Sequence, residues 1–174
     1  MLDGNPEALF KSWLHEYGGA VLKVARAYTQ TAEDCEDLVQ EILLQLWRSL
    51  PQFQGRASAS TWVYRVALNT ALGWHRKEGR RRARQQPLLE PEDLPTTEAD
   101  SAGQFHQREV LEQLYAAIRQ LPKAEAALVL LHLEDLSYRD IAEVLGISES
   151  NVGVKLNRAR KALGELMKEV VHES

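Results

Sequence analysis

Apolar residues recur every three or four positions along most of the chain, and this spacing limits what it can fold into. Leu38, Ile42 and Leu46 lie four residues apart, and Val152 and Leu156 repeat the spacing near the other end. Such spacing places apolar side chains on one side of an α-helix. No segment alternates apolar and polar residues as a half-buried strand does. The sequence therefore predicts an all-α fold.

A change in composition divides the chain in two. Residues 86–104 contain three prolines among acidic residues and few apolar ones. Such a segment cannot bury enough surface to offset the entropy that is lost on ordering. We therefore expect a flexible acidic linker between two small helical domains. These are an N-terminal helical bundle in residues 1–85 and a four-helix domain in residues 105–174.

Capping residues and helix breakers give the expected element ends in the first domain. A first helix is predicted from about Glu7 to Tyr28, with a bend or break possible at the glycine pair 18–19. Thr31 is a suitable N-cap for the acidic helix that follows. Pro51 is expected to end that acidic helix.

Residues 34–82 combine an acidic helix with an aromatic and basic one. The acidic side chains of the first helix lie outside its apolar stripe. A helix face that is only solvated, and binds no partner, shows the same pattern. In the second part, aromatic residues alternate with cations, as in proteins that stack single-stranded bases on rings and bind phosphates with guanidinium groups. The alternative is that the tryptophans are core residues and the arginines a solvated helix end. The aromatic residues are Phe53, Trp62, Tyr64 and Trp74, and the cations include Arg56, Arg65, Arg76 and Lys77.

The distribution of charge is compatible with nucleic-acid binding. The net charge of the chain is −4, but residues 51–86 carry 8 Lys or Arg and only 1 Asp or Glu. A local basic patch, and not the total, sets the affinity for phosphates.

A helix-turn-helix is predicted in residues 137–170. Ser137 and Asp140 form a capping box, Gly146 supplies a sharp turn, and Ser148 caps the second helix. The outer face of this second helix is basic, because residues 148–163 carry four cations and one anion. In this motif the N-terminal part of the second helix enters the major groove of DNA. The outward residues are Asn151, Lys155, Arg158 and Lys161.

Several other classes of protein lack support in the sequence. No run of about 18 apolar residues predicts a transmembrane helix, and the N-terminus lacks a signal-peptide pattern, so we expect a cytoplasmic protein. The single cysteine, Cys35, offers neither a disulfide nor a zinc-ligand set. We find no phosphate-binding glycine loop and no nucleophile with its base. No catalytic residue, metal or cofactor is therefore predicted.

The motifs in these two parts of the chain resemble those of one family. The segments DCEDLVQEILLQLW and STWVYRVALN resemble region 2 of the extracytoplasmic-function (ECF) sigma factors, within the sigma-70 family of bacterial RNA polymerase sigma factors. The segment LSYRDIAEVLGISESNVGVKLNRARKAL is similar to region 4.2 of the same proteins. The resemblance covers roughly residues 9–84 and 107–170. It implies a transcription initiation factor that binds core RNA polymerase and directs it to promoters.

The resemblance also implies roles for individual residues. Docking on the β′ clamp helices of the polymerase would involve Asp37, Leu38, Gln40 and Glu41. Binding of the −10 promoter element would involve Phe53, Arg56, Ser60, Trp62, Arg65, Asn69, Arg76 and Lys77. Binding of the −35 element, about 16–18 base pairs away, would involve Ser150, Asn151, Lys155, Arg158 and Arg160. The β flap of the polymerase and an anti-sigma factor are further implied partners.

Three alternatives remain open in the sequence. Gly153 departs from many relatives, and either a close approach to DNA or a weak, partner-stabilised helix would explain it. A helix-turn-helix regulator with an N-terminal sensing or dimerising domain would bind a palindromic duplex without polymerase. The spacing of Glu169 and His172 matches half of a di-iron motif, but that motif is needed twice.

Overall fold

The computed structural model describes residues 5–84 and 102–172, and throughout these ranges the regular structure is helical. This confirms the predicted all-α class. The predicted acidic linker falls almost wholly outside the described residues. The α-helices are α1 (Pro6–Tyr28), α2 (Ala32–Ser49), α3 (Ala59–Arg84), α4 (Ala102–Gln120), α5 (Lys123–Leu133), α6 (Tyr138–Leu145) and α7 (Glu149–His172), and a short 3-10 turn spans Leu50–Gln52.

Helix α1 is continuous through the glycine pair at which a bend was considered. It begins with Pro6 in its first turn, where the missing N–H costs no hydrogen bond. Trp13, Ala20 and Val21 are buried on either side of the two glycines. Their packing outweighs a loss of helix propensity of about 1 kcal/mol per glycine. Tertiary contacts therefore keep α1 straight enough to form one wall of the bundle.

Helix α2 begins and ends where the sequence predicts. The Thr31 side chain accepts a hydrogen bond from the Asp34 N–H at 3.1 Å, which satisfies one of the free donors of the first turn. The helix ends at Ser49, and Pro51 lies in the 3-10 turn that follows. The six residues after this turn, 53–58, carry the chain to α3.

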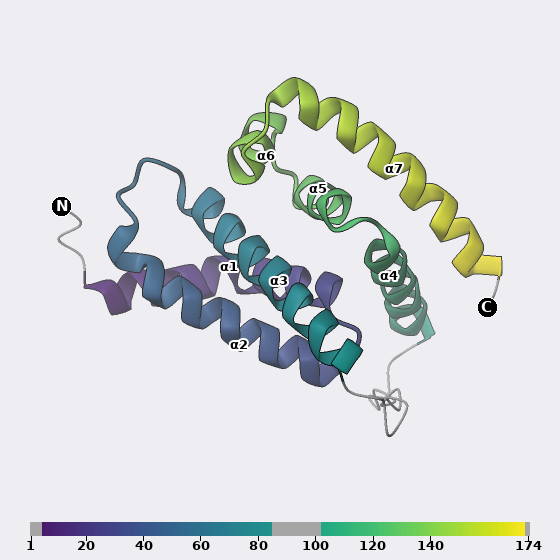
Figure 1. The fold of residues 1–174 in the computed structure, drawn as a ribbon, viewed down its shortest axis with the longest axis horizontal. Coiled ribbons are helices and arrows are strands. Elements are labelled where there is room, and N and C mark those ends of the chain that lie inside the picture. Colours follow the sequence, from purple (N-terminus) through teal and green to yellow (C-terminus); the bar gives the residue numbers. More distant parts are fainter. Residues whose placement is uncertain (1–4, 85–101, 173–174) are drawn as a thin grey trace.

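The seven helices form two layers (Figure 1). Helices α1, α2 and α3 pack together in the lower layer, and α4 to α7 form the upper layer, with α7 along its outer edge. Helix α1 also packs on α4 and α5, and α3 packs on α6. The buried side chains consequently form one apolar cluster that extends through both layers.

Candidate functional site

Helix α2 has two faces with opposite chemistry. Leu38, Ile42 and Leu46 are buried against α1 and α3. The opposite face exposes Asp37 and Gln40, and Glu41 is half-buried, with its carboxylate accepting from the Gln45 amide at 2.8 Å. Leu38 was among the residues expected at a polymerase contact, but its side chain is 0% exposed. It therefore holds the helix in place and does not present a surface.

Two apolar residues extend the exposed face of α2. At 100° per residue, Leu44 and Trp47 lie on the same side of the helix as Asp37 and Gln40. Leu44 is 41% exposed and Trp47 is 44% exposed. Phe10 packs edge-on against Trp47, with the ring centroids 5.3 Å apart. Neither residue was predicted to bind polymerase, although their position opposite the apolar stripe indicated that both would be exposed.

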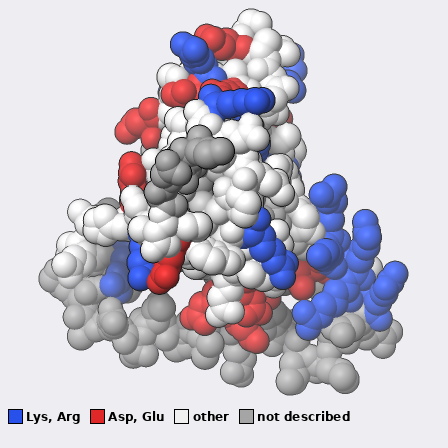
Figure 2. Space-filling view, turned by 90° about the vertical axis from the view of Figure 1, so that its left-hand side faces the viewer, with Lys and Arg blue, Asp and Glu red and all other residues white. Residues whose placement is uncertain are grey.

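One face of α3 gathers four of the eight residues expected to bind the −10 element. Trp62, Asn69, Arg76 and Lys77 lie within about a third of the helix circumference. Asn69, Arg76 and Lys77 are exposed, and Trp62 is half-buried. In Figure 2 the largest gathering of lysine and arginine side chains lies at one lower edge of the molecule, away from the carboxylates at the lower centre.

A groove of about 500 Å³ separates this face of α3 from α2. Glu41 and Gln45 line it from α2, and Asn69 and Lys77 line it from α3. The acidic surface of α2 and the cationic surface of α3 are therefore adjacent. Trp74 and Thr70 contribute an aromatic ring and a hydroxyl to the same groove.

The loop between α2 and α3 is held by an aromatic cluster. Phe53 contacts Trp13 and Trp62 edge-on, with centroid distances of 5.0 and 5.5 Å. The indole N–H of Trp62 donates to the Ser49 hydroxyl at 3.2 Å. Phe53 and Trp62 are thus partly in the core. For Trp62 this agrees with the alternative that the tryptophans are core residues. Gly55 adopts φ +71°, which favours glycine, and Arg56 beside it is exposed.

Ser58 fixes the start of α3. Its hydroxyl accepts from the Thr61 N–H at 3.1 Å and also contacts the hydroxyls of Ser60 and Thr61. Thr61 is fully buried and Ser60 is half-buried. The loop therefore offers Arg56 and the edge of the aromatic cluster to solvent on a rigid frame.

The helix-turn-helix has the predicted caps and turn. Ser137 accepts from the Asp140 N–H at 3.1 Å and donates to the Asp140 carboxylate at 2.6 Å. Gly146 ends α6 with φ +68°, in the left-handed region. Ser148 caps α7 by accepting from the Asn151 N–H at 3.2 Å. These contacts set the angle between α6 and α7.

The outer face of α7 is basic, but one expected residue lies elsewhere. Asn151, Lys155 and Arg158 are exposed and lie within about 60° of one another around the helix. Arg160 is also exposed, but it lies about half a turn from Asn151 and so does not share that face. Lys161 lies closer to the face of Asn151, Lys155 and Arg158. Ser150 is exposed beside the Ser148 cap.

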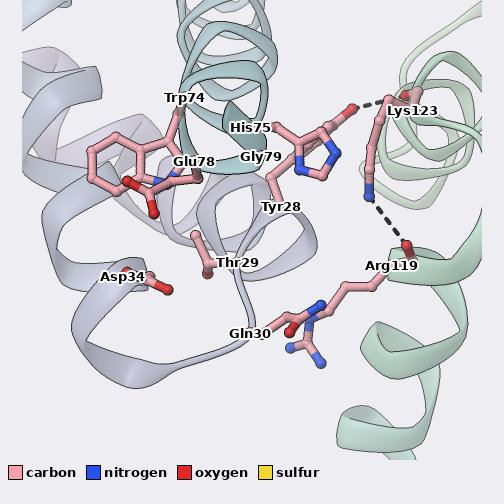
Figure 3. Close-up of a pocket in the computed structure, with 10 residues that line it drawn as sticks. All are labelled: Tyr28, Thr29, Gln30, Asp34, Trp74, His75, Glu78, Gly79, Arg119 and Lys123. Atoms are coloured by element: carbon pink, nitrogen blue, oxygen red, sulfur yellow. Dashed lines mark hydrogen bonds between the residues drawn. The ribbon is translucent and has the colours of Figure 1, made fainter. Parts of the chain in front are cut away.

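A cavity of about 330 Å³ lies between the layers (Figure 3). Lys123 and Arg119 line it from the upper layer, and Tyr28 and Trp74 line it from the lower one. Burial lowers the pKa of Lys123, and the nearby positive charge of Arg119 lowers it further. The Lys123 ammonium donates to the Arg119 carbonyl at 3.1 Å, which offsets part of the cost of burial.

The end of α7 carries the two residues that match half of a di-iron motif. Glu169 and His172 are exposed at the end of α7, and no group of three or more His, Cys, Asp or Glu that could hold a metal ion occurs in the described ranges. None of the helices in those ranges is long and apolar enough to cross a membrane.

Comparison with protein families decides the identity of the fold. Residues 13–81 match the model of sigma-70 region 2, and residues 111–163 match that of sigma-70 region 4. The chain is 30% identical to the RNA polymerase sigma factor YlaC of Bacillus subtilis, over 92% of this chain and 91% of the relative. It is 32% identical to the ECF RNA polymerase sigma-E factor of Haemophilus influenzae, over 81% of this chain and 79% of the relative. The chain belongs to the ECF sigma factors of the sigma-70 family.

Solved structures have the same fold as this sigma factor. The sigma factor RpoE of Bartonella quintana, crystallised with the anti-sigma factor NepR, matches with a TM-score of 0.70 and 23% identity, over 91% of this chain and 96% of that one. CnrH in complex with the cytosolic domain of CnrY matches with a TM-score of 0.66 and 20% identity, over 95% of this chain and 91% of that one. As a member of the family, the protein is a promoter-directing factor of RNA polymerase and not an enzyme. The regulator with a palindromic site and the di-iron protein are thereby excluded.

Proposed function

We propose that the sigma factor divides its tasks among three surfaces of the described structure. The exposed face of α2 docks on the β′ clamp helices of core polymerase. The adjoining face of α3 and the loop before it bind and open the −10 element. The outer face of α7 binds the −35 element, and the domain that carries it contacts the β flap. These assignments correspond to residues 1–85 and 105–174, joined by residues 86–104.

The observation that carries the proposal is the groove between α2 and α3. It places Glu41 and Gln45 of the docking face directly across from Asn69 and Lys77 of the cationic face. Polymerase bound to α2 would therefore lie beside DNA bound to α3. The half-buried rings and exposed cations at this edge suit unstacked bases and their phosphates. Trapping a flipped base costs a few kcal/mol, which stacking and phosphate contacts repay without nucleotide hydrolysis.

The docking face of α2 combines charge with apolar anchors. Asp37 and Gln40 provide polar contacts, and Leu44 and Trp47 provide exposed apolar area. Partly exposed aromatic residues of this kind dominate the binding energy of many protein interfaces. We therefore include Leu44 and Trp47 in the polymerase-binding surface.

On α7 we propose that Lys155, Arg158 and Lys161 bind phosphates and that Asn151 contacts a base edge. Cations fix the register on the duplex, while an amide can pair with adenine in the major groove. Ser150, in the first turn, would donate its hydroxyl to the backbone. Arg160 would contact DNA only at a position outside the face that carries Asn151, Lys155 and Arg158.

The proposal also includes a regulatory partner, an anti-sigma factor, and a cellular compartment, the cytoplasm. Both solved neighbours are complexes with protein partners, one of which is described as an anti-sigma factor. We propose that an anti-sigma factor binds this chain as well, and that the protein works in the cytoplasm, where polymerase and promoters are found.

The test is transcription reconstituted with purified core polymerase on fragmented genomic DNA. Wild-type protein should add discrete start sites that share two motifs about 16–18 base pairs apart. The double variant D37A/E41A should lose core binding, whereas E109A/E165A removes two exposed carboxylates on α4 and α7 and should not. The variant R76A/K77A should bind core normally but open promoters poorly. Normal core binding by D37A/E41A would refute the docking face.

A further inference from the structure

Val154 is an apolar side chain on the outer face of α7. It is 54% exposed, whereas Val152 and Leu156, on either side of it in the chain, are 0% and 1% exposed and pack in the core. At 100° per residue, Val154 lies about 60° from Asn151 and about 40° from Arg158 around the helix. It therefore belongs to the same face as the residues that we propose for the −35 element.

Polar side chains surround Val154 on its own helix. Residues three and four positions away are its neighbours on the helix surface, and these are Ser150, Asn151, Asn157 and Arg158, all of them exposed. A single exposed apolar residue is common on protein surfaces and needs no partner. A branched side chain lowers helix propensity, however, so a position that is only solvated gains nothing from valine. A partner that offers an apolar group would explain the valine at this position.

The major groove of DNA offers such a group. Its base edges present hydrogen-bond donors and acceptors, and thymine adds the apolar C5 methyl group. A valine side chain can neither donate nor accept a hydrogen bond. Opposite a polar edge it would displace water without replacing the hydrogen bonds that the water makes. Within the groove, Val154 is therefore favoured beside a thymine methyl group and disfavoured beside polar edges.

The spacing of residues on α7 limits where this thymine can lie. The Cβ atoms of helical residues three positions apart are about 5–6 Å from each other, and successive base pairs are about 3.4 Å apart. The contact of Val154 therefore lies within about two base-pair steps of the contact of Asn151. Both side chains are short, so the two residues face the same small part of the groove.

We propose that Val154 recognises the C5 methyl group of a thymine in the −35 element, within about two base pairs of the base that Asn151 contacts. The inference rests on the proposed function of α7. Lys155 and Arg158 would bind phosphates and hold the helix on any sequence, because phosphate contacts carry no sequence information. Val154 and Asn151 would then determine which sequence is preferred.

The experiment removes the methyl group from the DNA and the valine from the protein, separately and together. Holoenzyme is formed from core polymerase and the full chain, and competition between duplexes measures its affinity for a promoter that the transcription assay has identified. Each thymine of the −35 element, on either strand, is replaced in turn by deoxyuridine, which lacks only the C5 methyl group. The protein variant is V154A. The control is V110A, the same change at a valine of α4 that is 45% exposed.

We expect deoxyuridine to weaken binding of the wild-type holoenzyme by about fourfold at one thymine, as the burial of one methyl group suggests. V154A should fold normally, because alanine favours the helix and the side chain that it shortens is exposed. It should no longer distinguish thymine from deoxyuridine at that position, whereas V110A should keep the wild-type difference. If deoxyuridine has no effect at any thymine, or has an effect that V154A leaves unchanged, the inference is overturned.

A second variant of α7 distinguishes failure of this inference from failure of the proposed function. K155A/R158A removes two exposed cations from the same face. If its holoenzyme binds the promoter as tightly as the wild type does, α7 is not the face for the −35 element, and the proposed function fails whatever the modified duplexes report. If K155A/R158A binds weakly while V154A still distinguishes thymine from deoxyuridine, only the inference about Val154 fails.

Discussion

Replacement of Leu38 by alanine should destabilise the protein without removing a contact to polymerase. The Leu38 side chain is 0% exposed between α1 and α3, so the change leaves a cavity in the core. Buried leucines lose about 2–5 kcal/mol on truncation to alanine. For a chain of this size each kcal/mol lowers Tm by about 2–4 °C. A loss of about 3 kcal/mol therefore predicts a Tm lower by roughly 6–12 °C.

Leu44 supplies the matched control on the same helix. It undergoes the same chemical change but is 41% exposed, so truncation should cost less than about 1 kcal/mol and leave no closed cavity. Thermal unfolding followed by circular dichroism at 222 nm gives both Tm values. Fluorescence anisotropy then measures core binding well below either Tm. L44A should bind core more weakly than L38A, although L38A is the less stable variant.

Two results would contradict this division of α2 into a structural and a docking face. If L38A kept the wild-type Tm to within about 1 °C, Leu38 would not be a core residue in solution. If L38A, fully folded at the assay temperature, lost core binding while L44A retained it, the surface presented to polymerase would lie on the other side of the helix.

Three further predictions concern other parts of the chain. G153A should raise Tm, because alanine favours the helix by about 1 kcal/mol and its added methyl group would lie at an ordinary contact distance of 3.6 Å from Tyr138 Cε2. If binding of the −35 element also falls, the glycine is needed for close approach to DNA. The Cys35 thiol should react with a disulfide reagent more slowly in the native protein than in urea at pH 8, because burial raises its pKa and keeps it protonated; equal rates would contradict that burial. The raised pKa of the Cys35 thiol also makes stability depend on pH. The folded state keeps its full stability below the pKa of the unfolded thiol and loses stability as the pH rises from there through the pKa of the folded thiol. K155A should weaken binding to all −35 sequences and lower the slope of log affinity against log salt by about 1, whereas N151A should relax specificity at one base pair, as measured by competition between duplexes.

The sequence was sufficient to predict features that depend on local chemistry. The Thr31, Ser137 and Ser148 caps and the Gly146 turn all form as expected, because a side chain three residues from an N–H needs no distant partner. The buried stripe of α2 follows from spacing alone. These features set where helices begin and which face turns inward.

Features that depend on packing between distant segments were not predictable in this way. The glycine pair in α1 stays helical because neighbouring residues are buried, which propensity alone does not reveal. Phe53 packs between Trp13 and Trp62, which lie 40 and 9 residues away in the chain, and its own segment does not reveal these contacts. Arg160 was grouped with Asn151 through the family resemblance, although the helical rotation separates them.

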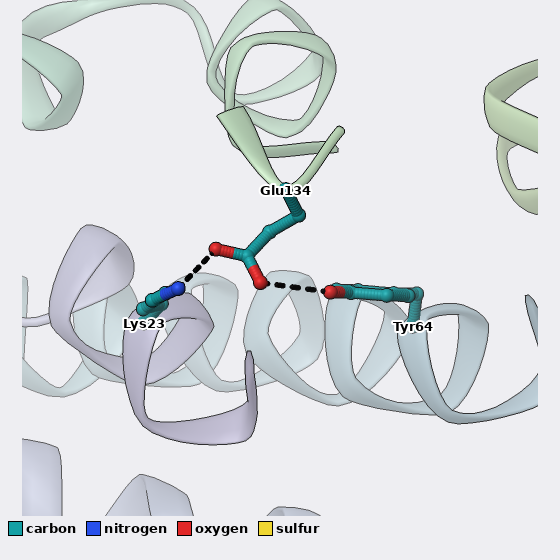
Figure 4. A network of polar contacts seen from close by, with 3 residues as sticks. All are labelled: Lys23, Tyr64 and Glu134. Carbon is teal, nitrogen blue, oxygen red and sulfur yellow. Dashed lines mark hydrogen bonds and ion pairs between the residues drawn. The ribbon is translucent and has the colours of Figure 1, made fainter. Parts of the chain in front are cut away.

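Glu134 follows α5, and its carboxylate accepts from the Lys23 ammonium of α1 at 2.5 Å and from the Tyr64 hydroxyl of α3 at 3.0 Å (Figure 4). This link belongs to the closed form, in which the two layers pack together, and it bears on how a regulator can act. A ligand shifts an equilibrium between closed and open forms only by its difference in affinity for the two. An anti-sigma factor that binds both layers in their closed arrangement would therefore inhibit even if it left the cationic face of α3 uncovered. The Arg65 guanidinium donates to the Glu143 carbonyl of the upper layer, so a regulator that stabilises this contact would also hold one of the residues that we expect at the −10 element.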